Sequence, residues 1–425
     1  MHLAITPQKL KGTVSVPPSK SMAHRAIICA SLAKGVSEIS HVVYSDDIIA
    51  TINAMKALGA NITRKDDTLL IDGANTFSNI NIVMDCNESG STTRFMIPIS
   101  IVKENHVTVI GRGKLGERPL DVFYDIFDRQ GIRYSRTGDL LHLTMQGVLK
   151  PDYFEVPGHV SSQFISGLLF ALPLLDGDST IHITTPLQSK SYIDLTLQML
   201  ESFGIEIIND HYKNFYIKGS QKYQPHDYYV ESDFSQAAFF LVADVIGNDV
   251  TLEGLNLETK QGDAVIIDLL ERMGGKLIHT NTGYKMKADT LKGITVDAGD
   301  CPDLIPALSV ALALSEGESH IVNAARLRIK ECDRLKAVSE MLEEAGVEVV
   351  EEADALHIKG IKSFKSAKLK TYDDHRMAMC EAILATRANG DIIIDNKECV
   401  KKSYPDFFEE YMRIGGICDE CELGE

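Results

Sequence analysis

The chain has 425 residues, 44 % of them hydrophobic and 24 % charged, which is typical of a soluble globular protein with more than one core. Its formal net charge of −17, from 43 basic and 60 acidic residues, argues against nucleic acid or an anionic membrane surface as a partner. The longest apolar runs, residues 165–175 and 304–314, are too short to span a bilayer and predict buried helices.

The N-terminus and the cysteines together predict a cytoplasmic protein. Residues 1–12 lack the apolar core of a secretory signal, and the eight cysteines are scattered apart from Cys418 and Cys421. This CxxC pair supplies only half of a tetrahedral zinc site. We therefore predict no metal, and we interpret the C-terminal segment as a frayed acidic tail.

The sequence repeats six times at a period of about 70 residues. Glycines that end amphipathic helices mark the period, with steps of 69 to 73 residues: Gly59, Gly131, Gly204, Gly274, Gly346 and Gly415. An acidic residue opens the same helix each time, at Asp47, Asp121, Asp194, Asp263, Asp333 and Asp406. Repeats of one unit present equivalent ends on one face, so the polar helix starts should gather there.

The first repeat predicts a strand, a helix, a strand, a helix and a hairpin, at residues 13–18, 19–35, 37–42, 46–59 and 60–73. The same hairpin recurs at residues 131–147, 204–219, 274–288 and 346–360, and none is predicted after Gly415. The alternation of strands and helices predicts an α/β (α+β) fold.

Three repeats on each side of a midpoint predict two domains of similar size. Pro225 and polar neighbours interrupt the pattern at residues 221–229, so we expect one domain over residues 13–227 and another over residues 1–12 and 228–425. Residues 1–12 are expected to pair with the last repeat. The chain would then cross between the domains twice, as a two-strand hinge that closes a cleft and expels water.

Three clusters at first-helix starts carry groups that bind anions. They are residues 17–25 with Lys20, Ser21 and Arg25, residues 87–94 with Gly90, and residues 159–164 with two hydroxyls and an amide. Each cluster alone is equally compatible with an ordinary helix cap or an exposed helix start.

The remaining helix starts add basic residues and three groups that can move protons. The carboxylates are Asp303 and Glu331, and the imidazole is His375. Any single Lys–Glu pair here is most often a solvated ion pair, but equivalent register should place these groups together. A cationic ring that holds two carboxylates predicts a transferase that joins two small anions without a cofactor.

Nine motifs, in order along the chain, resemble the 5-enolpyruvylshikimate-3-phosphate (EPSP) synthase family. They are PSKSMAHRAI, ESGSTTRF, GERPL, VSSQF, QSKSYID, DCPDLIPAL, RIKECDRL, DDHRMAM and SYPDFF. The resemblance implies two domains of three βαβαββ repeats, with helices inside and sheets outside. It further implies transfer of the enolpyruvyl group of phosphoenolpyruvate to the 5-hydroxyl of shikimate 3-phosphate in the cleft, in chorismate and aromatic amino acid biosynthesis.

The resemblance also implies the site residues. Shikimate 3-phosphate would contact Lys20, Ser21, Arg25, Ser161, Ser162, Gln163, Ser189, Tyr192, Asp303 and Lys330. Phosphoenolpyruvate would contact Lys20, Gly90, Arg118, Gln163, Arg334, Arg376 and Lys402. The catalytic residues would be Lys20, Asp303, Glu331 and His375. Asp303 with Lys20 would take the 5-hydroxyl proton, Glu331 would protonate C3 of phosphoenolpyruvate, and His375 with Lys402 would stabilise the departing phosphate.

A few positions depart from the family pattern. Ser91, Glu88 and Phe95 stand where other members have threonine, asparagine and proline, and Arg326 stands where some have asparagine. We therefore leave Arg326 outside the predicted site. Gly90 is the residue typical of glyphosate-sensitive members, so the resemblance implies inhibition by glyphosate in competition with phosphoenolpyruvate. A monomer without nucleic acid or membrane partners is expected.

Two alternatives remain open at this point. The sister family, UDP-N-acetylglucosamine enolpyruvyl transferase, shares the repeats and phosphoenolpyruvate. However, residues 111–119 lack the loop cysteine that its members commonly use as an acid. A non-catalytic clamp for polyanions is the other alternative, although the net charge and the carboxylates Asp303 and Glu331 count against it.

Overall fold

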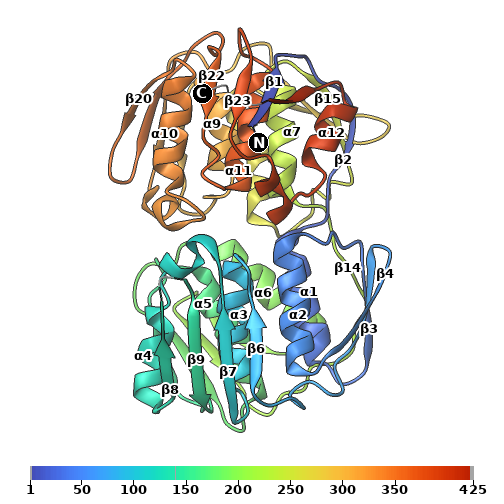
Figure 1. Ribbon diagram of the computed structural model, residues 1–425, viewed down its shortest axis with the longest axis vertical. Coiled ribbons are helices and arrows are strands. Elements are labelled where there is room, and N and C mark those ends of the chain that lie inside the picture. The colour runs from blue at the N-terminus through green and yellow to red at the C-terminus, as the bar shows by residue number, and fades with distance from the viewer. Residues whose placement is uncertain (1, 139, 422–425) are drawn as a thin grey trace. The chain divides into compact units, whose positions relative to one another are not determined.

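The computed structural model describes residues 2–138 and 140–421. The chain divides into two compact units (Figure 1). Each unit has its own buried apolar core. Unit 1 consists of Met1–Pro17 and Glu231–Glu425, and unit 2 consists of Pro18–Val230. The chain therefore passes from one unit to the other twice, after Pro17 and after Val230.

In its described part, unit 2 contains three four-stranded sheets of one strand order. The first consists of β14 (Tyr228–Tyr229), β3 (Val36–Ser40), β5 (Thr68–Asp72) and β4 (Asn61–Lys65). The second consists of β6 (Ile82–Asp85), β7 (Asn105–Ile110), β9 (His142–Gly147) and β8 (Arg133–Arg136). The third consists of β10 (Tyr153–Val156), β11 (Ser179–Ile183), β13 (Asn214–Ile217) and β12 (Ile207–Asp210).

Unit 1 repeats this pattern. Its sheets are β2 (Lys11–Ser15), β15 (Asp249–Glu253), β17 (Tyr284–Lys287) and β16 (Lys276–His279); β18 (Thr295–Asp297), β19 (Glu318–Val322), β21 (Leu356–Lys359) and β20 (Glu348–Glu351); and β22 (Ala367–Leu369), β23 (Ile392–Ile394), β1 (His2–Thr6) and β24 (Ile417–Cys421). In every sheet the first two strands are parallel and the other neighbours antiparallel. In four of the six sheets a helix joins the parallel pair; the pairs β14–β3 and β2–β15 are made by segments far apart in the chain.

The structure corrects the predicted pairing of the first strand. Residues 13–18 were assigned to the first repeat, but β2 pairs with β15 of the fourth repeat, with Val14 opposite Leu252. The corresponding place in the first repeat is taken by β14, which pairs with β3. The two repeats exchange these strands, and their similar local patterns could not show which sheet each would join.

As predicted, no hairpin follows Gly415 among the described residues, but the prediction of a frayed tail is wrong for residues 417–421; residues 422–425 lie outside the described part of the chain. Ile417–Cys421 forms β24, in which Cys418 lies opposite Ile5 and Cys421 opposite His2. The expected pairing of residues 1–12 with the last repeat is confirmed for residues 2–6, since β1 lies between β23 and β24, whereas Lys11 and Gly12 pair with β15 of the fourth repeat. The N-terminal strand therefore supplies the second strand that a hairpin supplies in the other repeats.

Each unit has six helices among its described residues. Unit 2 contains α1 (Lys20–Leu32), α2 (Asp46–Leu58), α3 (Gly90–Ser100), α4 (Asp121–Gln130), α5 (Ser162–Ala171) and α6 (Lys190–Ser202). Unit 1 contains α7 (Phe234–Val245), α8 (Ile266–Arg272), α9 (Ile305–Ala313), α10 (Arg334–Glu344), α11 (His375–Ala385) and α12 (Phe407–Arg413). Gly59 and Gly131 end α2 and α4 at φ of 111° and 70°, which favours glycine and explains its recurrence.

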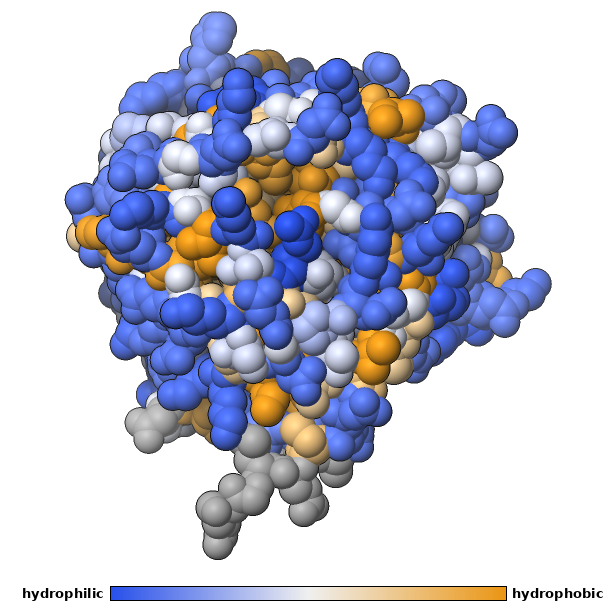
Figure 2. All heavy atoms as spheres, turned by 90° about the horizontal axis from the view of Figure 1, so that it is seen from above, coloured by the Kyte–Doolittle hydropathy of each residue, from blue (hydrophilic) through white to orange (hydrophobic). Residues whose placement is uncertain are grey.

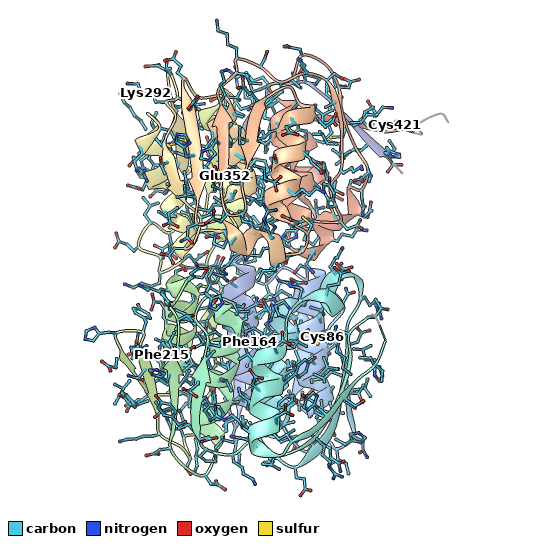
Figure 3. The ribbon with its side chains drawn as sticks, turned by 90° about the vertical axis from the view of Figure 1, so that its left-hand side faces the viewer. Cys86, Phe164, Phe215, Lys292, Glu352 and Cys421 are labelled. Carbon is cyan, nitrogen blue, oxygen red and sulfur yellow. The ribbon has the colours of Figure 1, made fainter. Side chains whose placement is uncertain are left out.

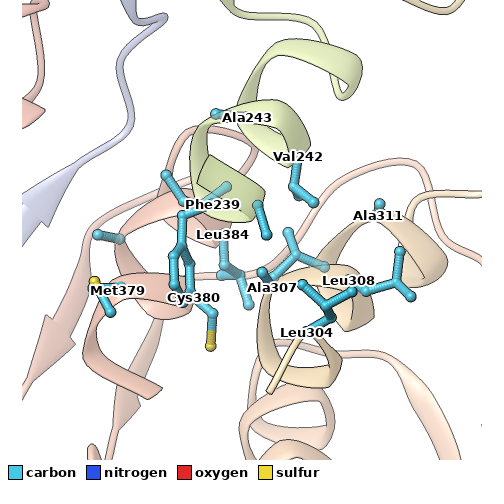
Figure 4. Close-up of a cluster of buried hydrophobic side chains, with 14 of the residues drawn as sticks. Phe239, Val242, Ala243, Leu304, Ala307, Leu308, Ala311, Met379, Cys380 and Leu384 are labelled. Carbon is cyan, nitrogen blue, oxygen red and sulfur yellow. The ribbon is translucent and has the colours of Figure 1, made fainter. Parts of the chain in front are cut away.

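The helices differ in how much of their surface is buried, because their sequences differ in how the apolar residues are distributed around the helix. Every residue of α7, α9 and α11 is buried, and these helices pack on one another through residues such as Phe239, Leu308 and Leu384 (Figure 4). In contrast, α4 buries one stripe, made of Val122, Phe123, Ile126 and Phe127. Helices that are buried on all sides lie in the core, so the sheets lie outside them.

Unit 2 is built in the same way. The helix residue Phe164 and the strand residue Phe215 are both fully buried there (Figure 3). On the face shown in Figure 2, hydrophilic residues cover most of the surface, with small apolar areas among them. Within residues 2–138 and 140–421, no helix is long and apolar enough to cross a membrane.

Candidate functional site

Lys20 of unit 2 lies at the start of a capped helix and is paired with a carboxylate. The Ser19 hydroxyl accepts a hydrogen bond from the Met22 amide at 3.4 Å and caps α1. Lys20 Nζ lies 2.8 Å from Oδ2 of Asp47, the second residue of α2, and the two side chains are only 16 % and 6 % exposed. Asp47 was not among the predicted site residues, although the acidic start of every second helix was the available signal.

Arg25 joins α1 to α6. Its Nε donates to Thr196 Oγ1 at 2.9 Å, and its Nη atoms donate to the carbonyl oxygens of Ser21 at 2.7 Å and Tyr192 at 3.0 Å. Burial lowers the pKa of Arg25 to about 10, so the side chain is still cationic at neutral pH. Arg25 thus fixes Ser21 and Tyr192 relative to each other.

Gln163 connects the starts of α3 and α5. Its Oε1 accepts from Arg94 Nη1 at 2.8 Å, and its Nε2 donates to Ser91 Oγ at 2.9 Å. Its backbone amide donates to Ser161, the N-cap of α5, at 3.3 Å. Arg94 lies within the predicted anion-binding cluster of residues 87–94 but was not among the predicted site residues. The Gln163 amide is therefore held in one orientation.

Gly90 and Arg118 are in direct contact. Gly90 is the first residue of α3, and a Cβ built on it would lie 2.6 Å from Nη1 of Arg118. Arg118 follows η1 (Gly113–Glu117), so a short turn carries its side chain to the start of α3. The absence of a side chain at position 90 is what lets the guanidinium lie there.

The remaining predicted residues of unit 2 lie at helix starts. Ser162 is the first residue of α5, and Ser189 precedes α6 in the left-handed conformation, with φ of 55°. Both are buried, as is Ser161. Thr92 Oγ1 donates to the Asp47 carbonyl at 3.4 Å, which links the Lys20 cluster to α3. Unit 2 therefore brings its predicted residues together at the N-termini of α1, α3, α5 and α6, where backbone amides favour anions.

Unit 1 has a second cluster, and Arg334 is at its centre. This side chain is 1 % exposed and contacts three carboxylates: Nη1 lies 2.6 Å from Asp303 Oδ1, Nη2 lies 2.7 Å from Glu331 Oε2, and Nε lies 2.6 Å from Asp374 Oδ2. Asp374 is the N-cap of α11 and was not assigned to the site from sequence. A planar guanidinium suits several such contacts at once.

Asp303 is surrounded by cations. Lys330 Nζ lies 3.3 Å from its Oδ1, and Arg376 Nη2 lies 3.6 Å from its Oδ2. Burial alone raises the pKa of Asp303, but Lys330, Arg376 and Arg334 hold it well below its usual value. Asp303 is therefore ionised at neutral pH and is a weak base while these cations surround it.

Two neighbours of this cluster have shifted pKa values. Burial lowers the pKa of Lys330 to about 8, against the opposing effect of Asp303, and Arg326 lowers it further. Burial and then Asp303 raise the pKa of Asp263 to about 6. Asp263 accepts a hydrogen bond from Ser235 and was missed as a site residue, because nothing in its motif distinguished it from a helix start.

His375 and Lys402 complete the predicted residues of unit 1. Both are buried; His375 begins α11, with its Nδ1 3.5 Å from Asp374 Oδ1. Lys402 ends η5 (Glu398–Lys402), which packs against α11. Every predicted residue of unit 1 thus lies at the start of α10 or α11 or in a segment next to them.

These clusters and the repeat architecture agree with a sequence-family match. The family model described as EPSP synthase (3-phosphoshikimate 1-carboxyvinyltransferase) matches residues 5–411. The chain belongs to this family. The predicted resemblance is thereby confirmed.

Relatives and solved structures support the same assignment. The chain is 50 % identical to the 3-phosphoshikimate 1-carboxyvinyltransferase of Clostridium beijerinckii over all of both chains. It is 52 % identical to that of Clostridium perfringens, over 97 % of this chain and 98 % of the relative. The names of these relatives do not favour the alternative that the chain is a UDP-N-acetylglucosamine enolpyruvyl transferase.

The fold is similar to that of the EPSP synthase of Acinetobacter baumannii, with a TM-score of 0.82 and 26 % identity over 99 % of this chain and 100 % of that one. The enolpyruvyl transferase NikO of Streptomyces tendae shares the fold, with a TM-score of 0.80 and 16 % identity over 98 % of both chains. The predicted α/β fold of repeated units is confirmed.

Proposed function

We propose that this chain transfers the enolpyruvyl group of phosphoenolpyruvate to the 5-hydroxyl of shikimate 3-phosphate and releases phosphate. The observation that carries the proposal is the family match over residues 5–411, together with carboxylates held inside a cationic cluster. The reaction belongs to aromatic amino acid biosynthesis. It joins two anions without oxidation or reduction, so the side chains need only bind charge and move protons.

We assign shikimate 3-phosphate mainly to unit 2. Lys20, Ser21, Arg25, Ser161, Ser162, Gln163, Ser189 and Tyr192 would hold it, with Asp303 and Lys330 of unit 1. Hydroxyls and amides at helix N-termini suit a phosphate group, as does a buried arginine. The bonds that Arg25 makes to the carbonyl oxygens of Ser21 and Tyr192 support this assignment, because they fix two of these residues beforehand.

We assign phosphoenolpyruvate to cationic residues of both clusters. Lys20, Arg118, Arg334, Arg376 and Lys402 would neutralise its carboxylate and phosphate, with Gly90 and Gln163 beside them. The contacts of Arg334 and Arg376 to Asp303 support the assignment of these two arginines. Oxygen atoms of a bound anion would compete with Asp303 for these cations.

The acid and base roles follow from this competition. When substrate oxygens take over the cations, the pKa of Asp303 rises, and Asp303 with Lys20 accepts the proton of the 5-hydroxyl as that oxygen attacks C2 of phosphoenolpyruvate. Glu331 protonates C3, which gives a tetrahedral intermediate. Loss of a proton from C3 and of phosphate from C2 then forms the product. His375 and Lys402 stabilise the departing phosphate.

The direct test is phosphate release by the purified chain with shikimate 3-phosphate and phosphoenolpyruvate, beside UDP-N-acetylglucosamine as the alternative acceptor. Phosphate released only with shikimate 3-phosphate is the expected result. Release only with the sugar nucleotide would contradict the proposed acceptor. No release with either would favour the non-catalytic polyanion clamp. We also propose that the chain acts as a monomer and is inhibited by glyphosate.

A further inference from the structure

The turn before α11 has an unusual backbone. Tyr372 and Asp373 are consecutive non-glycine residues in the left-handed conformation, both at φ of 53°. They lie between β22 and Asp374, the N-cap of α11. Side chains with a Cβ rarely adopt this conformation, and a pair of them requires support from the surroundings.

One other such pair occurs among the described residues, at His211–Tyr212. That pair lies in the tight connection between β12 and β13, where antiparallel strands favour left-handed residues. Tyr372 and Asp373 connect a strand to a helix, so hairpin geometry does not explain them. Their conformation must be held by other contacts.

Each residue of this turn makes a side-chain contact with another part of unit 1. Thr371 donates to Asp395 Oδ1 from its amide at 2.9 Å and from its hydroxyl at 2.7 Å. The Tyr372 hydroxyl donates to Glu340 Oε2 on α10. Asp373 Oδ1 accepts from Asn396 Nδ2 at 2.7 Å. Asp374 binds Arg334, which also lies on α10.

The next residues along the chain belong to the proposed site. The Arg376 amide donates to Asp374 Oδ1 at 2.9 Å, and the Arg376 side chain donates to the Asp303 carbonyl at 3.3 Å. The direction in which α11 starts therefore decides where Arg376 lies. A turn free to adopt ordinary backbone angles would give that start a range of directions.

We infer that Glu340, through its bond to Tyr372, is a positioning residue that locks the left-handed turn and thereby aims Arg376 at phosphoenolpyruvate. The inference rests on the proposed function, in which Arg376 binds that substrate. Neither Glu340 nor Tyr372 is among the residues proposed to touch the substrates. Their effect is on the geometry of Arg376, and it should be specific to the substrate that Arg376 binds.

The test compares Tyr372→Phe, which removes the hydroxyl, with Glu340→Gln, which keeps an acceptor. Tyr372→Phe is expected to raise the KM for phosphoenolpyruvate about fivefold or more, the scale of one lost hydrogen bond, with the KM for shikimate 3-phosphate unchanged. Glu340→Gln should retain most of the wild-type value. Lys336→Ala is the matched control: Lys336 Nζ pairs with the other Glu340 oxygen at 3.5 Å, and its loss should leave both constants unchanged.

A second variant tests whether the hydroxyl or the turn as a whole matters. Tyr372→Gly removes the hydroxyl and suits a positive φ, but it also removes a ring that packs against the apolar core of unit 1, so its melting temperature should fall. Its KM for phosphoenolpyruvate should rise at least as much as in Tyr372→Phe. A normal KM in both variants of an active enzyme would overturn the inference.

Hydrogen exchange shows whether a negative result contradicts the inference about Glu340 and Tyr372 or contradicts the proposed function. In Tyr372→Phe the amides of residues 374–378 should exchange faster than in the wild type, whether or not the wild type turns over shikimate 3-phosphate. Unchanged exchange would overturn the lock. If the wild type is inactive but exchange in residues 374–378 is faster in Tyr372→Phe, the proposed reaction and the role of Arg376 would be contradicted. The inference that Glu340 and Tyr372 hold the turn would still be supported.

Discussion

Arg118 lies against the open face of Gly90, with Nη1 only 2.6 Å from where a Cβ would stand. Gly90 begins α3 without a positive φ, so alanine suits the backbone there and the conflict is with the guanidinium alone. Because that guanidinium is the flexible end of a side chain, a methyl group would displace it at little cost to folding. The relationship therefore predicts a functional effect rather than an unstable protein.

We expect Gly90→Ala to raise the KM for phosphoenolpyruvate about tenfold or more, as expected for a displaced charge-assisted hydrogen bond. The melting temperature and the KM for shikimate 3-phosphate should change little. Glyphosate should compete with phosphoenolpyruvate in the wild type, with an inhibition constant not far above that KM, and should inhibit the variant less. Unaltered steady-state constants in the variant would mean that Arg118 does not bind this substrate.

Glu331→Gln tests the proposed acid. Arg334 donates to Glu331 Oε2 at 2.7 Å, and the amide oxygen of glutamine can accept the same bond. Substrate binding should therefore persist while kcat falls about 100-fold or more, the usual scale for loss of a general acid. Glu343→Gln, at an exposed position on α10, is the matched control. Near-normal turnover in Glu331→Gln would remove this residue from the proton transfer.

The pKa of Lys330, lowered to about 8 by burial, predicts an alkaline limit on activity. As the pH rises through 8 in the free enzyme, Lys330 loses its proton and with it the charge proposed to bind shikimate 3-phosphate. The ratio kcat/KM for this substrate should fall about tenfold per pH unit above that value. A profile measured from pH 6.5 to 9.5 checks this. A flat profile to pH 9.5 would show that the charge of Lys330 is not needed.

Replacement of Glu381 by a residue that does not ionise is expected to stabilise the folded protein. It is fully buried in α11, and burial, followed by Asp395 and Asp374, raises its pKa well above the usual value. Below the pKa of the unfolded state both states are protonated and the group has no pH-dependent effect. As the pH rises above that value the unfolded state ionises while the folded state does not, so stability falls until the folded pKa is reached.

Glu381→Gln should therefore raise the free energy of unfolding at pH 8, and raise it less at pH 5.5, because glutamine does not ionise. Urea unfolding at both pH values measures this difference. Glu409→Gln, at an exposed position on α12, is the control and should show no such gain. An equal effect of Glu381→Gln at the two pH values would show that ionisation of Glu381 is not its cause.

The sequence predicted the parts of this protein that depend on local pattern. Amphipathic spacing and recurring left-handed glycines such as Gly59 predicted the repeated unit, and the motifs around Lys20, Asp303 and Arg376 predicted the residues that gather at helix starts. The partners of these residues were not predicted. Asp47 and Asp374 look like ordinary acidic helix starts until the fold brings them to Lys20 and Arg334.

The sequence by itself determined the order of helices and strands, because each element's hydrophobic period is set by its own residues. Only the tertiary structure decided which strands pair. The exchange of β2 and β14 between repeats, and the completion of the last sheet by β1 and β24, join segments far apart in the chain. Likewise, only packing decided that Asp303 lies among three cations and that Glu381 is buried, since a pKa depends on neighbours in space and on loss of water.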